Sequence, residues 1–358
     1  MSESVEQESA AGAFRRGFAM RRLVLFGILF AGLTALGIYA VYSQVAGSSF
    51  EWDSRLVSGR LLASTLGLLL VYFTADGLRL WFTLRALGHS VSLPGTIQLV
   101  FMNIFVSNIT PLATGGGFVQ VWFLRRHGVP VGTGLTATTI RTALAVLFIF
   151  GSAPMLLAFI PGAESAARSN AVLVPLLISV GLYLGFFALL ILRPGWLLRP
   201  VQAILVLLKR LHLIRAERYE RWMKRIEQEL HRFSVGFGRY FRGRWYDILA
   251  SILFTAVFLL SLFSFPALLL QALEYDFSYW QVIGRMLLTT FVMYFSPTPG
   301  ASGIAEGVFG QFFGGMVAAG HIVLITIAWR VITIYLGMII GLFMTQAELT
   351  RIGKEDAA

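Results

Sequence analysis

Long apolar runs separated by short charged segments dominate the chain. Six of them lie at residues 23–45, 61–82, 135–160, 171–192, 248–273 and 322–346. Each is long enough for a helix to cross a bilayer core of roughly 30 Å. The runs lack the strict alternation that marks a membrane β-strand. The pattern therefore predicts an all-α polytopic membrane protein with six transmembrane helices.

Two further apolar regions, at residues 96–124 and 281–317, are too long for one span and are interrupted by Pro and Gly. The first contains TPLATG, and the second contains TPGASG. Proline and glycine interrupt helices, so each region is predicted to break near its middle. We expect two re-entrant helical hairpins, each entering the membrane and leaving on the same side.

Each predicted hairpin is preceded and followed by a span, so residues 61–160 and 248–346 share one order of elements. With the spans counted from a cytoplasmic N-terminus, the two copies are inserted upside down relative to each other. Inverted-topology repeats whose broken helices meet near the midplane are typical of secondary transporters. We predict a single transmembrane domain at residues 23–346 that contains this repeat.

Composition and charge agree with a membrane protein: 57% of residues are hydrophobic, 13% are charged and the mean hydropathy is +0.75. The net charge is +11, and the basic residues gather in the N-terminal tail 1–22, the loop 193–245 and the C-terminal tail 347–358. The positive-inside rule places these three segments in the cytoplasm. The charge is therefore attributed to topology and to anionic lipid headgroups, and no nucleic-acid partner is expected.

The sequence offers little for catalysis. Cysteine is absent, and the five histidines are scattered without metal-ligand spacing. No phosphate-binding loop, nucleophile elbow or dinucleotide fingerprint occurs. We expect no cofactor, no metal and no enzymatic activity. A membrane-embedded enzyme acting on a lipid phosphate is a competing hypothesis, weakened because Glu306 is essentially the only carboxylate expected inside the membrane.

Two arginines occupy matching positions within apolar spans. Arg141 lies 30 residues after Pro111, and Arg330 lies 31 residues after Pro299. An arginine at membrane depth is costly and normally faces a cavity or a partner. Its planar fork suits a lipid phosphate, so both residues are candidate headgroup ligands. The alternative is an internal salt bridge that fixes helix packing.

Carboxylates near these arginines have two interpretations. Glu306 is a candidate proton- or cation-sensing group, or a counter-ion to Arg141 or Arg330, and a purely structural ion pair is equally compatible with the sequence. Asp76 and Arg79 lie three residues apart on one predicted helix. We expect them to pair locally near its cytoplasmic end, in a structural role.

The predicted hairpin tips supply the remaining candidate substrate-binding residues. Backbone N–H groups freed by the breaks, together with the helix N-termini, suit an anion such as a phosphate. Alternatively, the Gly and Pro residues allow close helix packing, and the polar side chains satisfy freed backbone groups. The candidates are Asn108, Thr110, Pro111, Gly115, Gly116, Gly117, Thr298, Pro299, Gly300, Ser302 and Gly303.

The basic loop at residues 193–245 carries apolar residues at helical spacing, namely Tyr219, Met223, Ile226, Leu230 and Phe233. This pattern predicts an amphipathic helix lying on the inner leaflet. The loop would anchor the topology, recruit anionic lipid, or dock a cytosolic or membrane enzyme.

The stretches SNITPLATGGGFVQVWFLRRHGVPVG and SPTPGASGIAEGVFGQFF resemble a family of flippase-like membrane proteins, and the resemblance extends over roughly residues 21–346. That family is related to the transmembrane domain of lysylphosphatidylglycerol synthase, the multiple peptide resistance factor. Gly117 stands where many relatives have an acid, whereas Glu306 matches the family's second acid. The synthases also carry a soluble aminoacyl-transferase domain; the sequence here ends at Ala358, so we expect no aminoacyl-lipid synthesis.

The resemblance implies a multi-pass protein of the bacterial inner or archaeal plasma membrane that moves a lipid or lipid-linked headgroup between leaflets. Membrane lipids with anionic or zwitterionic headgroups are its expected partners. No ATP site is visible, so transport would run downhill or be coupled to ions. The alternative function is a non-catalytic scaffold in a lipid- or glycan-modifying pathway.

Overall fold

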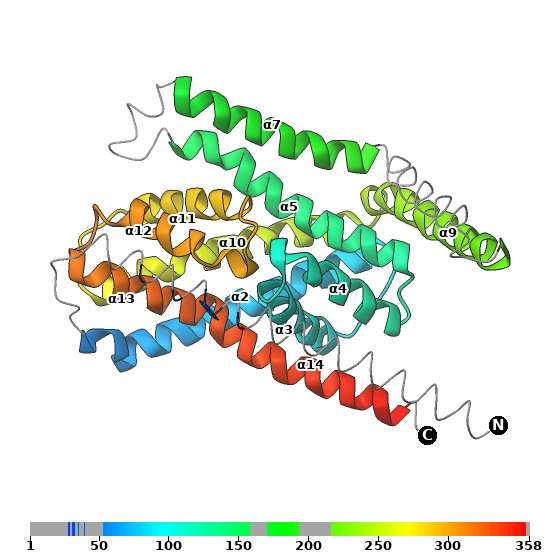
Figure 1. Ribbon diagram of the computed structural model, residues 1–358, viewed down its shortest axis with the longest axis horizontal. Helices are drawn as coiled ribbons and strands as arrows, with labels where there is room; N and C mark the ends of the chain where they lie inside the picture. Colours follow the sequence, from blue (N-terminus) through cyan, green and yellow to red (C-terminus); the bar gives the residue numbers. More distant parts are fainter. Residues whose placement is uncertain are drawn as a thin grey trace. The chain divides into compact units, whose positions relative to one another are not determined.

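The computed structural model describes residues 53–157, 170–192 and 216–355, together with Ile28, Ala31, Gly32, Ala35 and Tyr39. These ranges are mostly helical and contain no strand (Figure 1). The predicted span at residues 23–45, apart from those five residues, lies outside the described part of the chain. The predicted tail 1–22 and the first part of the basic loop, residues 193–215, also lie outside it.

The same order of elements occurs twice along the chain, as the sequence predicts. The first run is α2 (Gly59–Ala86), α3 (Leu93–Asn108), the short turn η2 (Pro111–Ala113), α4 (Thr114–Arg126) and α5 (Val131–Leu157). The second run is α10 (Trp245–Ala272), α11 (Tyr279–Met293), η4 (Pro299–Ala301), α12 (Ile304–Phe313) and α13 (Ala319–Arg330). Both predicted hairpin regions are therefore two helices separated by a break at the T-P-x-A motif.

Five further helical elements complete the described ranges. A single-turn helix η1 (Ser54–Val57) precedes α2, and α7 (Asn170–Leu192) and α9 (Ala216–Phe241) lie between the two runs. After α13 the chain passes through a π-helical turn, η5 (Val331–Tyr335), into α14 (Leu336–Glu355). The predicted C-terminal tail is thus helical as far as Glu355.

Four helical stretches in the described ranges are long and apolar enough to cross a membrane: Gly59–Ala86, Val131–Ser152, Trp245–Ala272 and Gly320–Arg351. They coincide with four of the six predicted spans. A fifth prediction, at residues 171–192, corresponds to α7, which contains the shorter apolar stretch Leu177–Phe186. The chain is an all-α membrane protein with several long apolar helices.

The chain forms two compact units. Within the described part of the chain, one comprises residues 102–116 and 292–355, and we call it the tip unit because it holds both T-P-x-A motifs. The other comprises residues 53–101 and 117–291, and we call it the long-helix unit. Both units draw residues from both sequence repeats, so the compact units do not coincide with the repeats.

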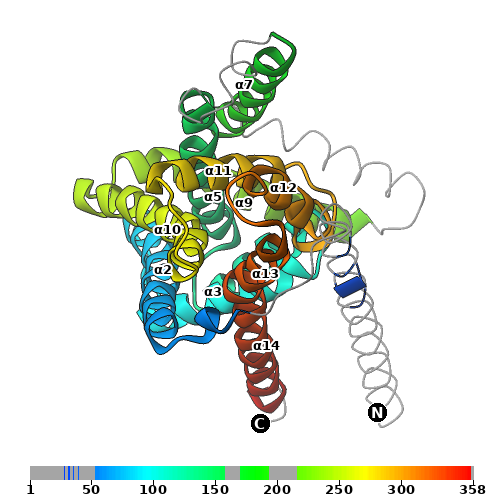
Figure 2. The ribbon, with the colours of Figure 1, turned by 90° about the vertical axis from the view of Figure 1, so that its left-hand side faces the viewer.

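The core of the long-helix unit is built around α2 and α10, which pack along each other (Figure 2). Their contact is aromatic: the rings of Tyr72 and Phe258 stack with centroids 5.0 Å apart, and those of Phe82 and Phe254 stack at 5.6 Å. The opposite face of α2 exposes leucines at helical spacing, including Leu62. An exposed apolar face on a long helix is expected where the surroundings are lipid.

Helix α9 packs on α5 and does not present its whole apolar face to a membrane. Phe233, Phe237 and Tyr240 are buried along this contact. The two helices can approach closely because Gly236 has no side chain: an added Cβ there would lie only 2.4 Å from the Thr136 hydroxyl oxygen. Phe233, one of the predicted apolar positions of this amphipathic helix, is therefore covered by protein.

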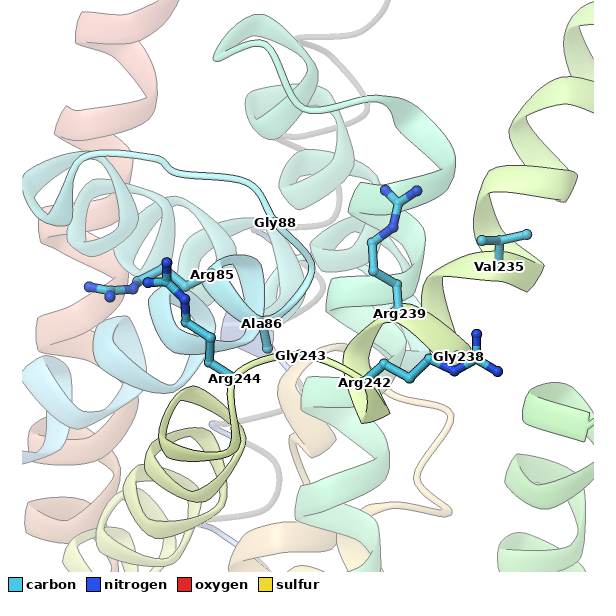
Figure 3. Close-up of a pocket in the computed structure, with 9 residues that line it drawn as sticks. All are labelled: Arg85, Ala86, Gly88, Val235, Gly238, Arg239, Arg242, Gly243 and Arg244. Atoms are coloured by element: carbon cyan, nitrogen blue, oxygen red, sulfur yellow. The ribbon is translucent and has the colours of Figure 1, made fainter.

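The connection from α9 to α10 is fixed against the end of α2 (Figure 3). A Cβ on Gly243 would lie 2.6 Å from the Ala86 carbonyl oxygen, so only glycine permits this approach. The Tyr240 and Ser251 hydroxyls are 2.7 Å apart and link α9 to α10. The consecutive helices α9 and α10 are thus held against the end of α2, which lies far from them in sequence.

Candidate functional site

The two T-P-x-A motifs adopt the same unusual backbone. After the proline, Leu112 and Ala113 have φ values of 54° and 52°, and Gly300 and Ala301 have 56° and 54°. Left-handed backbone costs a residue other than glycine roughly 1–2 kcal/mol. Pro111 and Pro299 each begin the short turn, which follows an extended Thr110 or Thr298. The sequence repeat is therefore also a repeat of a strained local conformation.

The two motifs meet in space. Turns η2 and η4 are separated by almost two hundred residues, yet they lie against each other within the tip unit. Irregular backbone in a membrane is tolerated only where protein covers it or where it lines a cavity. The contact between η2 and η4 therefore covers part of each irregular turn with protein.

An ion pair buried in the tip unit holds the second motif. Arg330 and Glu306 are fully buried, and Arg330 Nε lies 2.7 Å from Glu306 Oε1. Arg330 Nη2 donates hydrogen bonds to the Gly300 carbonyl at 3.0 Å and to the Ser302 hydroxyl at 3.4 Å. Glu306 Oε2 accepts the Gly303 N–H at 2.7 Å. The pair thus clamps the turn from α13 and caps the start of α12.

One nitrogen of the Arg330 guanidinium takes no part in these contacts. Arg330 Nη1 is buried and has no hydrogen-bond partner among the described residues. A buried charged donor without a partner is costly, so this atom is a ready contact for an oxygen ligand. Of the two arginines expected as counter-ions for Glu306, it pairs with Arg330.

Polar side chains at the tips bond to their own backbone. Thr298 Oγ1 donates to the Ser302 carbonyl at 2.8 Å, and Thr110 Oγ1 donates to the Val106 carbonyl at 2.8 Å. Asn108 Nδ2 donates to the Ile104 carbonyl at 2.7 Å. In this conformation these side chains satisfy backbone groups next to the breaks.

The three glycines that follow η2 differ in their surroundings. A Cβ on Gly115 would lie 2.7 Å from Val106 Cγ1, and one on Gly116 would lie 1.9 Å from the Ser107 hydroxyl oxygen. Both glycines therefore permit α4 to pack closely on α3. Gly117 has nothing within 4 Å of an added Cβ, so the acid expected there from the resemblance meets no steric barrier.

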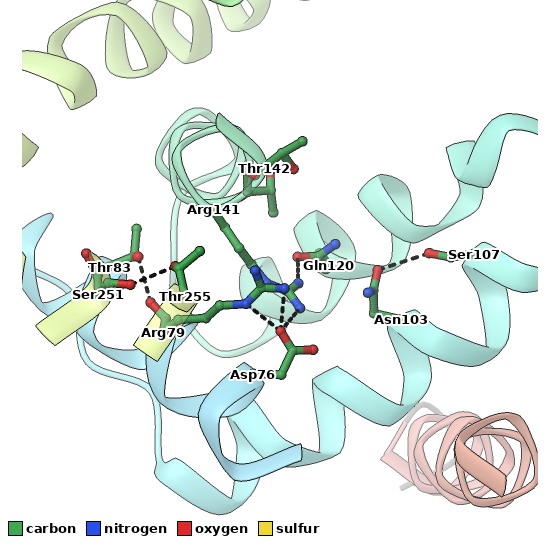
Figure 4. Close-up of polar contacts among 11 residues, drawn as sticks. Asp76, Arg79, Thr83, Asn103, Ser107, Gln120, Arg141, Thr142, Ser251 and Thr255 are labelled. Atoms are coloured by element: carbon green, nitrogen blue, oxygen red, sulfur yellow. Dashed lines mark hydrogen bonds and ion pairs between the residues drawn. The ribbon is translucent and has the colours of Figure 1, made fainter. Parts of the chain in front are cut away.

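Arg141 belongs to a second buried cluster, in the long-helix unit. Figure 4 shows it reaching from α5 toward Asp76 on α2 and Gln120 on α4. Its Nη2 pairs with Asp76 Oδ1, and its Nη1 donates to Gln120 Oε1 at 2.7 Å. Arg79 pairs with the same Asp76 oxygen and stacks on the ring of Phe258, 3.8 Å from its centroid. Two arginines thus share one carboxylate.

Asp76 corrects two expectations. It is 2% exposed and bridges two helices, whereas the sequence suggested only a local pair with Arg79 near the helix end. It also means that Glu306 is not the only buried carboxylate within the apolar helices. Its position well inside the continuous helix Gly59–Ala86 was the available signal, because a carboxylate placed there requires a cationic partner.

The two repeats neutralise their matching arginines differently. Counted from the proline, Phe118 stands where Glu306 stands, and Phe118 is 79% exposed. The first repeat therefore lacks a carboxylate on its own hairpin, and Arg141 takes one from α2. Arg330 consequently fixes a hairpin tip, whereas Arg141 fixes the packing of α5 on α2.

The two clusters differ in charge: two guanidinium groups share one carboxylate at Asp76, whereas Arg330 and Glu306 balance each other. Guanidinium groups suit phosphate oxygens. No group of three or more histidine, aspartate or glutamate side chains suited to a metal ion occurs among the described residues.

Two comparisons identify relatives. The profile of the family described as lysylphosphatidylglycerol synthase TM region matches residues 22–341. The chain is also 24% identical over 320 residues to a UPF0104 membrane protein of Archaeoglobus fulgidus, covering 89% of this chain and 96% of that protein. Both hairpins and both buried clusters fall within the matched region. The chain therefore belongs to the family of the lysylphosphatidylglycerol synthase transmembrane region.

Proposed function

We propose that this protein moves a lipid with an anionic or zwitterionic headgroup between the leaflets of the plasma membrane. The observation that carries the proposal is the pair of tips: two strained breaks of identical backbone meet, and a fully buried arginine clamps one of them. A helix that only needed to span the membrane would require neither the break nor the buried charge. Both features suit a path for a polar headgroup.

The proposed topology makes the two hairpins re-entrant and the two repeats inverted, with both termini in the cytoplasm. The repeated order of elements and the positive-inside charge distribution support it. Inverted hairpins reach the bilayer midplane from opposite faces, so tips that meet are suited to a substrate site reached from either leaflet in turn.

The proposed binding step is an exchange of anions at Arg330. Removing one partner from a buried ion pair costs about 3–5 kcal/mol, because the other charge stays buried and unpaired. A phosphate that replaces Glu306 on the guanidinium offsets this cost for Arg330, and Nη1 adds a donor with no protein partner among the described residues. The displaced Glu306 carboxylate keeps the Gly303 N–H as its donor at the start of α12, where a helix N-terminus favours a negative charge. Because Arg330 also holds the Gly300 carbonyl, the exchange would loosen the tip.

The test is a leaflet-translocation assay with the purified full chain in vesicles containing fluorescent phosphatidylglycerol or phosphatidylethanolamine. The wild type should exceed empty vesicles, and Arg330→Gln should lower its rate at least about tenfold, since one charge-assisted contact is worth about 1.5–3 kcal/mol. Arg232→Gln is the matched control, because Arg232 forms an exposed pair with Glu229 on α9.

Wild-type rates equal to those of empty vesicles for both lipids would contradict the proposal. Equal loss in Arg330→Gln and Arg232→Gln would also contradict the assigned role of Arg330. Monodispersity and thermal unfolding of each variant identify any loss that is due to misfolding.

A further inference from the structure

A basic pocket of about 630 Å³ lies in the long-helix unit, where the end of α2 meets the junction of α9 and α10 (Figure 3). Four arginines, Arg85, Arg239, Arg242 and Arg244, line it together with glycine, alanine and valine. Its lining contains no acidic residue. It shares no residue with the clusters at Arg330 and Arg141.

The pocket has a fixed frame. Gly243 is pressed against the Ala86 carbonyl, so the backbone that carries Arg242 and Arg244 is held on α2. Arg85 is held in turn by the buried Asp247, with Nε 3.2 Å from Oδ1, and its guanidinium lies over the ring of Trp81 at 4.5 Å. Because this backbone is already held in place, ligand binding costs little conformational entropy.

The described residues do not balance the positive charge in the pocket. Asp247 pairs with Arg85, but none of the other three arginines forms an ion pair with a described residue. Figure 3 shows Arg244 reaching toward Arg85 on one side and Arg239 standing opposite them. Burial, and then the charge of Arg239, lower the pKa of the nearby His89.

The surroundings place the pocket at the level of lipid headgroups. Trp245, which is 73% exposed, and Tyr246 begin α10 directly beside it. Exposed aromatic side chains of this kind gather at the membrane–water interface. Further along α10, Leu249 and Leu253 expose an apolar surface on which acyl tails would lie.

We propose that this pocket binds a phosphate group, and specifically the headgroup phosphate of an anionic lipid whose tails lie along α10. Guanidinium groups on both sides of the pocket would donate to the phosphate oxygens, in the geometry that arginine favours. The proposal does not depend on lipid translocation, because it concerns retention of a lipid at a separate site.

The experiment measures lipid retention by the full chain in detergent, using native mass spectrometry with added phosphatidylglycerol or phosphatidylcholine. Three variants alter the pocket or its charge. Arg239→Gln/Arg244→Gln removes two guanidinium groups. Gly238→Glu adds a carboxylate at a lining position where an added Cβ meets nothing within 4 Å, and Gly238→Gln adds the same bulk without charge. Arg125→Gln/Arg126→Gln removes two exposed arginines at the end of α4 as the matched control.

We expect phosphatidylglycerol to bind the double arginine variant and Gly238→Glu at least about tenfold more weakly than the wild type. Binding to Gly238→Gln and to the α4 control should stay within about twofold. Equal phosphatidylglycerol binding by wild type, pocket variants and control would overturn the proposal, as would equal retention of phosphatidylcholine and phosphatidylglycerol by the wild type.

A second arm adds inorganic phosphate to distinguish the two sources of the same chemistry. Failure of millimolar phosphate to displace the lipid or to raise the unfolding temperature supports the lipid headgroup. Phosphate that stabilises the wild type but not the pocket variants, with no selective lipid retention, shows a site for soluble phosphate compounds and overturns the lipid assignment.

Discussion

At the scale of single residues, matching sequence positions do not imply matching roles. Arg141 and Arg330 lie at nearly the same distance from their prolines, yet one shares Asp76 with Arg79 and the other is alone with Glu306. The first cluster carries an excess of positive charge, whereas the second is balanced. The two arginines should therefore respond differently to substitution.

The Arg330–Glu306 pair makes a specific prediction about stability. Glu306→Met alone should destabilise the protein by about 3–5 kcal/mol, because it leaves a buried guanidinium without its counter-charge. The double variant Glu306→Met/Arg330→Met should recover most of that loss, since an apolar pair avoids the desolvation cost. Denaturant unfolding in detergent checks this, and a double variant no more stable than Glu306→Met would contradict it.

At the scale of elements, the broken helices were the most predictable feature of the chain. The T-P-x-A motifs place proline and the following glycines together in the middle of a long apolar run, and both breaks occur there. A single proline is not sufficient for a break, since Pro266 lies within the continuous helix α10. The packing of α9 was not predictable in the same way. The sequence pattern of an amphipathic helix is the same whether lipid or protein covers its apolar face. In this structure the close contact with α5 occurs at glycines, Gly132 on α5 and Gly236 on α9.

The α5–α9 contact predicts contrasting effects of two similar substitutions. An added Cβ at Gly132 would lie 2.0 Å from the Glu229 carbonyl oxygen, so Gly132→Ala should push α9 away and lower stability. Gly238→Ala, on the face of α9 where space is open, should be neutral or raise stability by up to about 1 kcal/mol through helix propensity. Limited proteolysis of α9 provides the readout, and faster cleavage in Gly238→Ala than in Gly132→Ala would refute the contact.

At the scale of the whole molecule, the sequence predicted the helical class, the repeated order of elements and the family. Length and apolarity determine the helical class, and the two T-P-x-A motifs with their flanking stretches indicate the repeat and the family. None of these signals depends on which helices touch. The contacts between distant residues were not predicted: Asp76 pairs with Arg141, 65 positions away, and no local sequence pattern indicates this pair. Nor did charge counting find the basic pocket, because its arginines come from two separate helices and the segment that follows one of them.

The inverted topology is tested by cysteine labelling, which the absence of native cysteine makes clean. Ser90→Cys and Arg126→Cys flank the first hairpin, and both should react with an impermeant maleimide only from the cytoplasmic side. Ser278→Cys and Ala318→Cys flank the second hairpin, and both should react from outside. Labelling of the two ends of either hairpin from opposite faces would exclude a re-entrant segment.

The π-helical turn at Val331–Tyr335 begins directly after Arg330 and has a mechanical consequence. A π turn holds one more residue than the α-helix around it, and that surplus residue can migrate along the helix as hydrogen bonds switch partners. Each residue of an α-helix corresponds to about 100° of rotation, so migration of the surplus residue would rotate α14 about its own axis. Arg330 is hydrogen-bonded to the Gly300 carbonyl, so the hairpin tip would keep its position while α14 rotates.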